Sequence, residues 1–245
     1  MTFVRRNGTS VAWTVVVPLK PLPRAKSRLA GAVRDGWRPA LALAFAQDTV
    51  RAALACGRVG GVVVVTDDPH AARELSALGA RVEPDTPHRS PDGLNAALAH
   101  GVLAVRARLP RAPVAALNAD LPALREVELD RVLADAAGSA RAFLADAAGV
   151  GTTLLTAAAG VELAPAFGGP SRARHRASGA REITLTGVDS VRQDVDTAAD
   201  LRTALRLGLG RYTARLLAEH SPVPPPSPAA PTTPTAPGLP GPVRG

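Results

Sequence analysis

The sequence TVVVPLKPLPRAKSRL occupies residues 14–29 and joins a β-branched apolar run to a basic segment rich in proline. The apolar run, residues 11–17, has the pattern of a strand that is buried on both faces, as in a parallel sheet covered by helices. The prolines after it remove hydrogen-bond donors and fix φ, so they stiffen the loop that follows. We therefore expect a central strand whose carboxyl end continues into a preordered basic loop.

This basic loop contains both lysines of the chain, Lys20 and Lys26, whereas every other cation among the 29 Lys and Arg residues is arginine. A lysine ammonium group is a compact point charge on a flexible stem, which suits neutralisation of a polyphosphate. We interpret Lys20, Lys26 and Arg28 as a cradle for nucleotide phosphates. The alternative is a solvent-exposed turn with two ordinary surface lysines, because a single motif of this kind often arises by chance.

Composition restricts the class of protein. A chain of 245 residues with 46% apolar residues can form one large α/β domain or two small ones. Aromatic residues make up only 3%, which disfavours a nucleic-acid surface built on base stacking. The formal charge of +8 favours a polyanionic partner, and because the arginines are scattered we expect small phosphorylated ligands rather than nucleic acid.

Several features bear on localisation and domain organisation. The single cysteine, Cys56, cannot form an internal disulfide, and no apolar run reaches the length of a membrane span. No signal-peptide apolar region stands at the N-terminus, so we expect a cytoplasmic protein. We expect a loose N-terminus (1–10), one folded domain (11–219) and a disordered tail (220–245), because residues 221–245 contain ten prolines and one charged residue.

Strand-like and helix-like segments alternate along the chain, which predicts βαβ units and a parallel sheet. The expected strands are 11–17, 60–65, 80–83, 114–117, 141–145 and 151–156. The expected helices are 39–56, 70–78, 125–137 and one that Asp92 caps and whose apolar face runs from Leu94 to Val105.

Polar residues near the expected ends of strands and helices are candidates for a site. Asp120 follows the strand 114–117, and ligands of open parallel sheets bind beyond the carboxyl ends of strands. Asp194 and Asp196 share a face if the chain is extended there, but Asp196 also fits a helix cap, which makes Asp194 the better ligand candidate. Asn95, in the first turn of its helix, can read a nucleobase edge, bind a ribose or phosphate, or tie the helix start.

Two glycine-containing loops could bind anions. Residues 149–153, GVGTT, predict a sharp turn with exposed backbone amides, which is typical of an anion nest. Residues 165–176, PAFGGPSRARHR, place two glycines before Ser171, which can cap a basic helix and so form a phosphate or carboxylate site. A surface hairpin followed by a basic helix is an equal alternative for the second loop.

Seven motifs, taken together and in order, resemble one protein family closely. They are PLKPLPRAKSRL, TDD, DGLNAAL, NADLPAL, GVGTTLL, FGGPS with a following histidine, and DVDTAADL. The family is the 2-phospho-L-lactate guanylyltransferases of coenzyme F420 biosynthesis, in particular its actinobacterial branch described as phosphoenolpyruvate guanylyltransferase. The match extends from Thr14 to about Leu207, which is nearly the whole expected domain.

The resemblance implies a single-domain GT-A nucleotidyltransferase fold, with a Rossmann-like, doubly wound and mostly parallel sheet. It implies transfer of a guanylyl group from GTP to phosphoenolpyruvate or 2-phospho-L-lactate, with release of pyrophosphate. It also implies a downstream transferase of the same pathway as a further partner. The alternatives are another GT-A nucleotidyltransferase, for a sugar phosphate or a molybdopterin-type acceptor, and a basic nucleic-acid-binding module.

The resemblance also assigns roles to individual residues. It implies that three residues bind the phosphorylated acid: Thr153, Gly168 and Ser171. It implies that Asp120 and Asp194 bind Mg²⁺. Asn118 stands where related enzymes can carry a second carboxylate, so one or two metal ions, and a role for Asp196, remain open.

Overall fold

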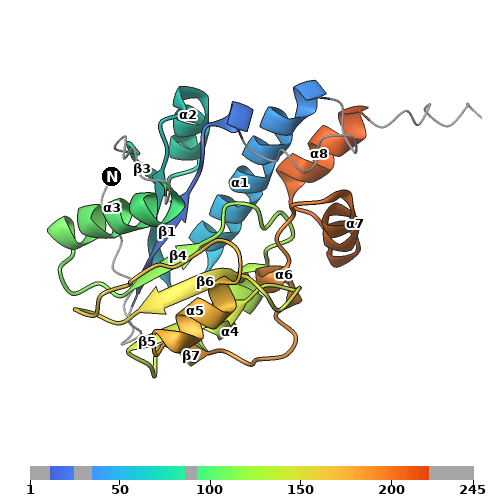
Figure 1. Ribbon diagram of the computed structural model, residues 1–245. Helices are drawn as coiled ribbons and strands as arrows, with labels where there is room; N and C mark the ends of the chain where they lie inside the picture. Colours follow the sequence, from blue (N-terminus) through green and yellow to red (C-terminus); the bar gives the residue numbers. More distant parts are fainter. Residues whose placement is uncertain (1–11, 25–34, 86–92, 221–245) are drawn as a thin grey trace, which may run out of the picture.

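The computed structural model describes residues 12–24, 35–85 and 93–220 (Figure 1). Lys26, Arg28 and Asp92 lie outside the described residues, as do the predicted loose N-terminus and residues 221–245 of the predicted tail. Among the described residues, no helix has both the length and the apolar character needed to span a membrane.

One sheet of seven strands forms the centre of the described structure. The strands are β1 (Trp13–Pro18), β2 (Val59–Val65), β3 (Arg81–Glu83), β4 (Val114–Leu117), β5 (Arg141–Ala145), β6 (Thr152–Ala157) and β7 (Arg181–Glu182). Their order is β3-β2-β1-β4-β6-β5-β7, and neighbours are parallel except that β6 is antiparallel to β4 and β5. The expected mostly parallel, doubly wound α/β sheet is therefore confirmed.

Helices cover both faces of this sheet. They are α1 (Arg38–Ala55), α2 (Pro69–Ala77), α3 (Gly93–Arg108), α4 (Glu126–Ala136), α5 (Ser171–Ala177), α6 (Asp189–Arg192), α7 (Ala198–Leu207) and α8 (Arg211–His220). Before α1, the described residues include the short 3₁₀ turns η1 (Leu22–Arg24) and η3 (Asp35–Trp37). The expected strands and helices match the observed ones within two residues at each end, whereas the sequence patterns missed β7, α6 and α8.

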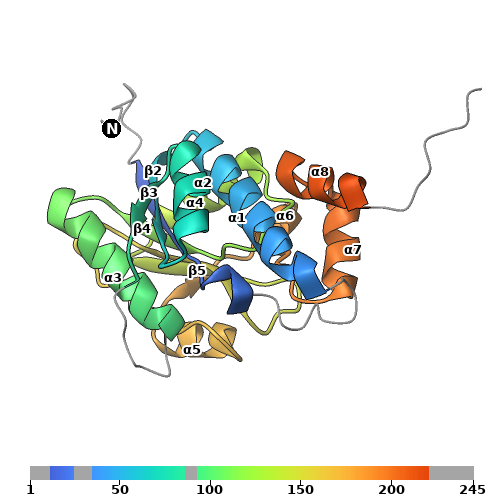
Figure 2. The same cartoon turned by 90° about the horizontal axis from the view of Figure 1, so that it is seen from above.

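Side chains of β1 divide the core into two layers, because successive residues of a strand point to opposite faces. Val15 and Val17 belong to the apolar cluster that includes residues of α1, α2 and α4, while Val16 belongs to the cluster that includes residues of α3. Figure 2 shows α3 and α5 on one side of the sheet and α1 and α2 on the other. The strand is fully buried, as its apolar sequence predicted.

Helix α3 lies unusually close to the sheet at Gly101. A Cβ atom at this position would lie 2.6 Å from Val16 Cγ1 and 2.7 Å from Val65 Cγ2. Glycine therefore permits the middle of α3 to pack directly against Val16 of β1 and Val65 of β2.

Helix α8 is held against α1 by a buried carboxylate. Asp48 of α1 accepts hydrogen bonds from the backbone amides of Tyr212 (3.0 Å) and Thr213 (2.8 Å), at the start of α8. Burial raises the pKa of the Asp48 carboxyl, and these hydrogen bonds oppose that rise. The C-terminal helix therefore docks through a specific polar contact as well as through apolar packing.

Candidate functional site

The order of the strands puts a topological switch point between β1 and β4. The chain runs from β1 outward to β2 and β3 and then returns to β4 on the other side of β1, which makes a topological switch point. Ligands of such sheets bind beyond the carboxyl ends of the strands at this point. Val16 pairs with Ala116, so both strands end within two residues of that pair. The segments that carry Lys20 and Asp120 therefore leave the sheet from neighbouring strand ends.

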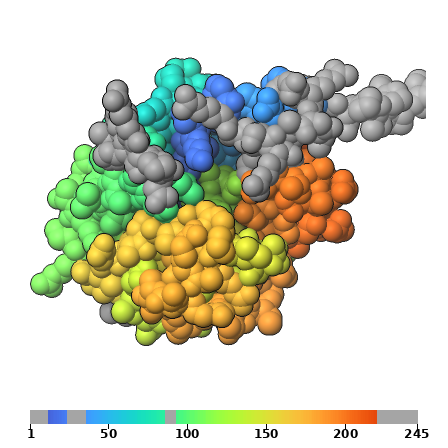
Figure 3. Space-filling model, in the orientation of Figure 1, coloured from blue at the N-terminus to red at the C-terminus, as the bar shows by residue number. Residues whose placement is uncertain are grey.

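The basic loop leaves β1 at this edge with Lys20 exposed. In the space-filling view the blue surface of this segment lies between the green part of the chain and the yellow and orange parts (Figure 3). The loop continues directly into η1. A contact with Asp68, which follows the end of β2, fixes the start of this turn. The backbone amide of Leu22 donates to Asp68 Oδ2 at 3.0 Å.

Asp68 holds the loop and the start of α2 together. Its Oδ1 atom accepts from the backbone amides of His70 and Ala71, both at 3.0 Å, while Oδ2 accepts from Leu22. Burial alone would raise the pKa of the Asp68 carboxyl, but the amides of Ala71, Leu22 and His70 outweigh it and hold the pKa below its usual value. Asp68 is a site residue that sequence reasoning missed, because the motif TDDP indicated only the start of a helix.

The two predicted metal ligands come from segments that are hydrogen-bonded to each other. The backbone amide of Val195 donates to the carbonyl oxygen of Asp120 at 3.1 Å, which brings Asp194 beside the end of β4. Gln193 Nε2 donates to the Asp194 carbonyl at 2.9 Å and helps to fix this segment. Asp120 and Asp194 are half-buried and Asp196 is exposed, and the preference for Asp194 as a ligand stays a prediction.

This pair of carboxylates suits a hard cation. Carboxylate oxygens are ligands that Mg²⁺ prefers, and Mg²⁺ commonly binds one or two carboxylates together with substrate phosphates. Over the described parts of the chain, no cluster of three or more His, Cys, Asp or Glu residues could hold a metal ion. A metal at Asp120 and Asp194 would therefore complete its coordination with water and substrate oxygens.

Thr153 of β6 lies against the segment that carries Asp120. The backbone amide of Asn118 donates to the Thr153 carbonyl at 3.0 Å. Thr153 itself is fully buried, and its hydroxyl has no hydrogen-bond partner among the described residues. The structure thus joins Thr153 to the segment that carries Asp120, and its predicted contact with the acid stays a prediction.

The turn before β6 does not form the expected anion nest. The backbone amides of Val150 and Gly151 donate to the Asp146 carboxylate, at 2.9 Å and 2.8 Å. The chain's own carboxylate occupies the position that an external anion would need, so this prediction is wrong. The motif GVGTT carries no sign of this partner, because Asp146 stands outside it.

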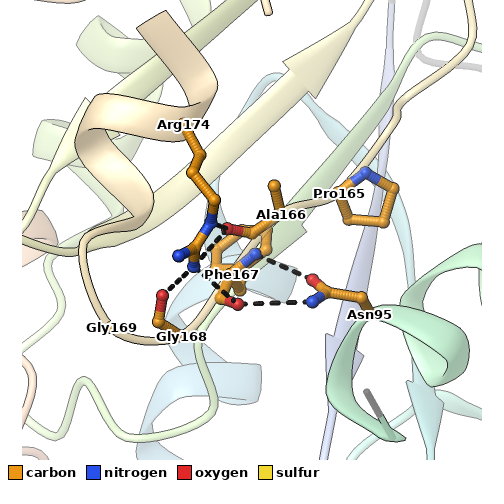
Figure 4. A pocket seen from close by; sticks show the side chains of 7 residues that line it. All are labelled: Asn95, Pro165, Ala166, Phe167, Gly168, Gly169 and Arg174. Atoms are coloured by element: carbon orange, nitrogen blue, oxygen red, sulfur yellow. Dashed lines mark hydrogen bonds between the residues drawn. The ribbon is translucent and has the colours of Figure 1, made fainter. Parts of the chain in front are cut away.

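Residues 165–169, which we call the glycine loop, form a second part of the site. They line an open hollow of about 460 Å³ (Figure 4). The lining residues are Asn95, Pro165, Ala166, Phe167, Gly168, Gly169 and Arg174. Gly168 and Gly169 have φ of +91° and +45°, values that favour glycine, so the sequence pair GG is needed for the sharp turn. The predicted residues Asn95 and Gly168 therefore lie at one site.

A buried histidine supports the glycine loop from below. His175 Nε2 accepts from the backbone amide of Ala166 at 3.0 Å, and Nδ1 lies 2.9 Å from Thr152 Oγ1. Because Nε2 accepts, the ring is neutral and carries its proton on Nδ1. Burial, and then the positive charges of Arg141 and Arg174, lower the pKa of His175 to about 4. A neutral, buried histidine with these hydrogen bonds orders the loop and does not act as an acid.

Two predicted helix caps are wrong. Ser171 is the buried first residue of α5, and the cap position belongs to Pro170, which makes no side-chain cap hydrogen bond. Asp196 does not cap α7 either. Thr197 does so, and it forms a capping box with Asp200. At α7 two side chains that can cap a helix, Asp196 and Thr197, are adjacent, so the sequence alone could not choose between them.

The predicted site residues thus fall into two groups. Lys20 follows β1, and Asp120, Asp194 and Thr153 belong to segments at the end of β4 that backbone hydrogen bonds join. Asn95 and Gly168 line the hollow at the glycine loop, and Ser171 begins α5 directly after that loop. Lys26 and Arg28 lie outside the described residues.

Known proteins resemble this chain over most of its length. A family model described as "Guanylyl transferase CofC like" matches residues 13–220. Phosphoenolpyruvate guanylyltransferase of Streptomyces coelicolor is 68% identical over 206 residues, which cover 84% of this chain and 96% of the relative. The proteins of the same name from Streptomyces avermitilis and Thermomonospora curvata are 66% and 58% identical, and the matches cover 84% and 86% of this chain and 94% and 91% of theirs.

Solved structures share the fold at low sequence identity. A nucleotidyl transferase from Methanothermobacter thermautotroptrophicus has a TM-score of 0.55 and 22% identity, and the match covers 80% of this chain and 97% of that one. A 4-diphosphocytidyl-2C-methyl-D-erythritol synthase also has a TM-score of 0.55, with 14% identity and coverage of 80% and 99%. These likenesses support the nucleotidyltransferase fold alone.

Proposed function

The chain belongs to the CofC-like guanylyl transferase family, and from this premise we propose that it transfers the guanylyl group of GTP to phosphoenolpyruvate. The observation that carries the choice of acceptor is the match, at 66–68% identity over 84% of the chain, to relatives named phosphoenolpyruvate guanylyltransferase. 2-Phospho-L-lactate is the second candidate acceptor, since it differs from phosphoenolpyruvate only by saturation of one bond. In either case the product belongs to coenzyme F420 biosynthesis.

The reaction needs little proton transfer. A phosphate oxygen of the acceptor attacks the α-phosphorus of GTP, and the bond from that phosphorus to the bridging oxygen of the β-phosphate breaks. Pyrophosphate leaves, and because the attacking phosphate is already ionised at neutral pH, no general base is required. The main barrier is the approach of two polyanions, which an enzyme lowers by neutralising charge and by aligning the groups in line.

Residues at the ends of β1 and β4 would supply this neutralisation. Lys20, with Lys26 and Arg28 as further predicted members of the cradle, would hold the triphosphate and the leaving pyrophosphate. Asp68 would keep the loop in place by its hydrogen bond to Leu22. The neutral His175 has no role as an acid here, which agrees with chemistry that moves no proton.

Asp120 and Asp194 would hold a Mg²⁺ ion. Their segments are joined by the Val195 hydrogen bond, and both side chains are half-buried beside the switch point. When bound, the ion would supply positive charge to the α-phosphate of the nucleotide.

The acceptor would bind between Thr153 and the glycine loop. Gly168 presents backbone without a side chain, and Ser171 stands at the start of α5. Thr153 is adjacent to the Asp120 segment through the Asn118 hydrogen bond, which would bring the acid toward the α-phosphate. This placement rests on the order of the segments and on the family resemblance.

Release of pyrophosphate from the purified full chain tests the proposal. GTP should be tried with phosphoenolpyruvate, 2-phospholactate and 3-phosphoglycerate in turn, each with Mg²⁺ and each after addition of a chelator. We expect the fastest turnover with phosphoenolpyruvate, little with ATP in place of GTP, and loss of turnover with the chelator. Faster turnover with another acid would reassign the acceptor, and no turnover with any acid would refute the proposed activity.

A further inference from the structure

The side chain of Asn95 pairs with the backbone of the glycine loop. The amide of Phe167 donates to Asn95 Oδ1 at 2.8 Å, and Asn95 Nδ2 donates to the Phe167 carbonyl at 3.3 Å (Figure 4). The Asn95 amide therefore contacts one residue through both its oxygen and its nitrogen, in the same way that one strand pairs with the next. Asn95 stands in the first turn of α3, so this contact links that helix to a loop 72 residues further along the chain.

Two residues from α5 hold the same loop from the other side. His175 accepts from the Ala166 amide, and the Arg174 guanidinium donates to the carbonyl oxygens of Ala166, Phe167 and Gly168. The Phe167 ring is buried, 5.1 Å from the His175 ring in an edge-to-face arrangement. Residues 166–168 are therefore fixed between α3 and α5 by side chains, and this stretch ends at Gly168, the first of the two glycines with positive φ.

We infer that Asn95 is a positioning residue for the acceptor site, which ties α3 to the glycine loop, and that it does not read the nucleobase. This inference rests on the proposed function, because the glycine loop is the expected acceptor site. To read a base edge, an asparagine uses its oxygen and its nitrogen as a bidentate pair. In this protein both atoms are hydrogen-bonded to the backbone of Phe167. A nucleobase that used the same oxygen and nitrogen would have to compete with these two hydrogen bonds.

The two roles predict different kinetics. A residue that positions the acceptor loop changes the KM for the acid, and it leaves the KM for GTP and the choice between purine bases unchanged. A residue that reads guanine changes the KM for GTP and the preference for GTP over ITP, which lacks the exocyclic amine. The two substrates can be varied independently, so a single set of variants separates the roles.

Asn95→Ala and Asn95→Asp are suitable variants. The first removes both hydrogen bonds. The second keeps the size and the acceptor for the Phe167 amide, but it turns a carboxylate oxygen toward the Phe167 carbonyl. Leu103→Ala is a matched control, because Leu103 is an exposed residue of the same helix and is 67% exposed.

We expect each Asn95 variant to raise the KM for phosphoenolpyruvate, or for whichever acid the wild-type chain uses, by about tenfold, the scale of one lost hydrogen bond that leaves a polar group unsatisfied. The KM for GTP and the ratio of kcat/KM values for GTP and ITP should stay within about twofold of wild type. The control should match wild type in all three. A changed GTP-to-ITP ratio, or an unchanged KM for the acid, would overturn the inference.

Amide hydrogen exchange of the full chain gives a readout that needs no turnover. The peptide that contains Ala166 and Phe167 should exchange faster in Asn95→Ala than in wild type or in the control, because the variant frees one end of the loop. Equal exchange would overturn the inference even if the enzyme is active. A wild-type chain that turns over no acid would refute the proposed function, and the exchange comparison would still decide whether Asn95 holds the loop.

Discussion

Acidification should destabilise the fold through His175. This side chain is fully buried, its Nε2 accepts from the Ala166 amide at 3.0 Å, and its Nδ1 faces Thr152 Oγ1 at 2.9 Å. Protonation would place an N–H group at Nε2 against the N–H group of Ala166. Burial, reinforced by the charges of Arg141 and Arg174, accordingly lowers the pKa of His175 to about 4, from a usual value of 6.5.

The sign and size of the effect follow from proton linkage. The unfolded chain binds the proton of His175 more readily than the folded chain, so the free energy of unfolding falls as the pH drops from 6.5 toward 4. With these two pKa values, lowering the pH from about 7.5 to about 5 reduces the free energy of unfolding by about 2 kcal/mol. Because the surface loop above the ring can relax and hydrate the charge, we expect a loss of about 1–2 kcal/mol.

Urea denaturation of the wild-type chain and of His175→Gln, each near both pH values, measures this loss. All other titrating groups are common to the two chains, so the difference between their pH dependences isolates His175. We expect the wild-type free energy of unfolding to fall by about 1–2 kcal/mol more than that of the variant, with unchanged m-values. Equal losses in the two chains would refute the assignment of a neutral, acid-sensitive histidine.

Three further substitutions test other parts of the structure. Asp120→Asn should abolish Mg²⁺-dependent release of pyrophosphate, and a fully active variant would exclude Asp120 as a metal ligand. Asp48→Ala should lower the free energy of unfolding by about 1–3 kcal/mol, since two buried amides at the start of α8 lose their acceptor; an unchanged melting temperature would contradict this. Gly101→Ala should cost about 1–3 kcal/mol in urea denaturation, because its Cβ would lie 2.6 Å from a valine side chain of β1; Leu103→Ala, on the exposed side of the same helix, is its control.

Local patterns predicted the framework well, because a strand or helix depends mainly on residues close together in the chain. The valine runs of β1 and β2 are buried on both faces, and the apolar face predicted from Leu94 to Val105 is the face of α3 that packs on the sheet. The loop after β1 and Asp120 after β4 could also be placed, since the carboxyl ends of parallel strands meet at one edge. The short elements β7 and α6 were missed because they carry too few residues to show a period.

The contacts that shape the site join residues far apart in sequence, and no local pattern contains them. Asp146 fills the turn that looked like an anion nest, and Asp68 reaches back to Leu22 across 46 residues. The hydrogen bonds between Asn95 and Phe167 span 72 residues, so the sequence around Asn95 could not predict them.

By itself, the sequence determined the kind of sheet, the edge of the sheet at which Lys20 and Asp120 lie and the family to which the chain belongs. These depend on hydrophobic periodicity, on the order in which strands and helices follow one another along the chain, and on motifs that each lie within a few residues. Only the tertiary structure decided which polar groups form hydrogen bonds within the protein, as at Asp146, and which side chain fixes which loop, as Asn95 fixes the glycine loop. A hydrogen bond needs atoms within about 3 Å of each other, and that proximity arises only when distant segments pack together.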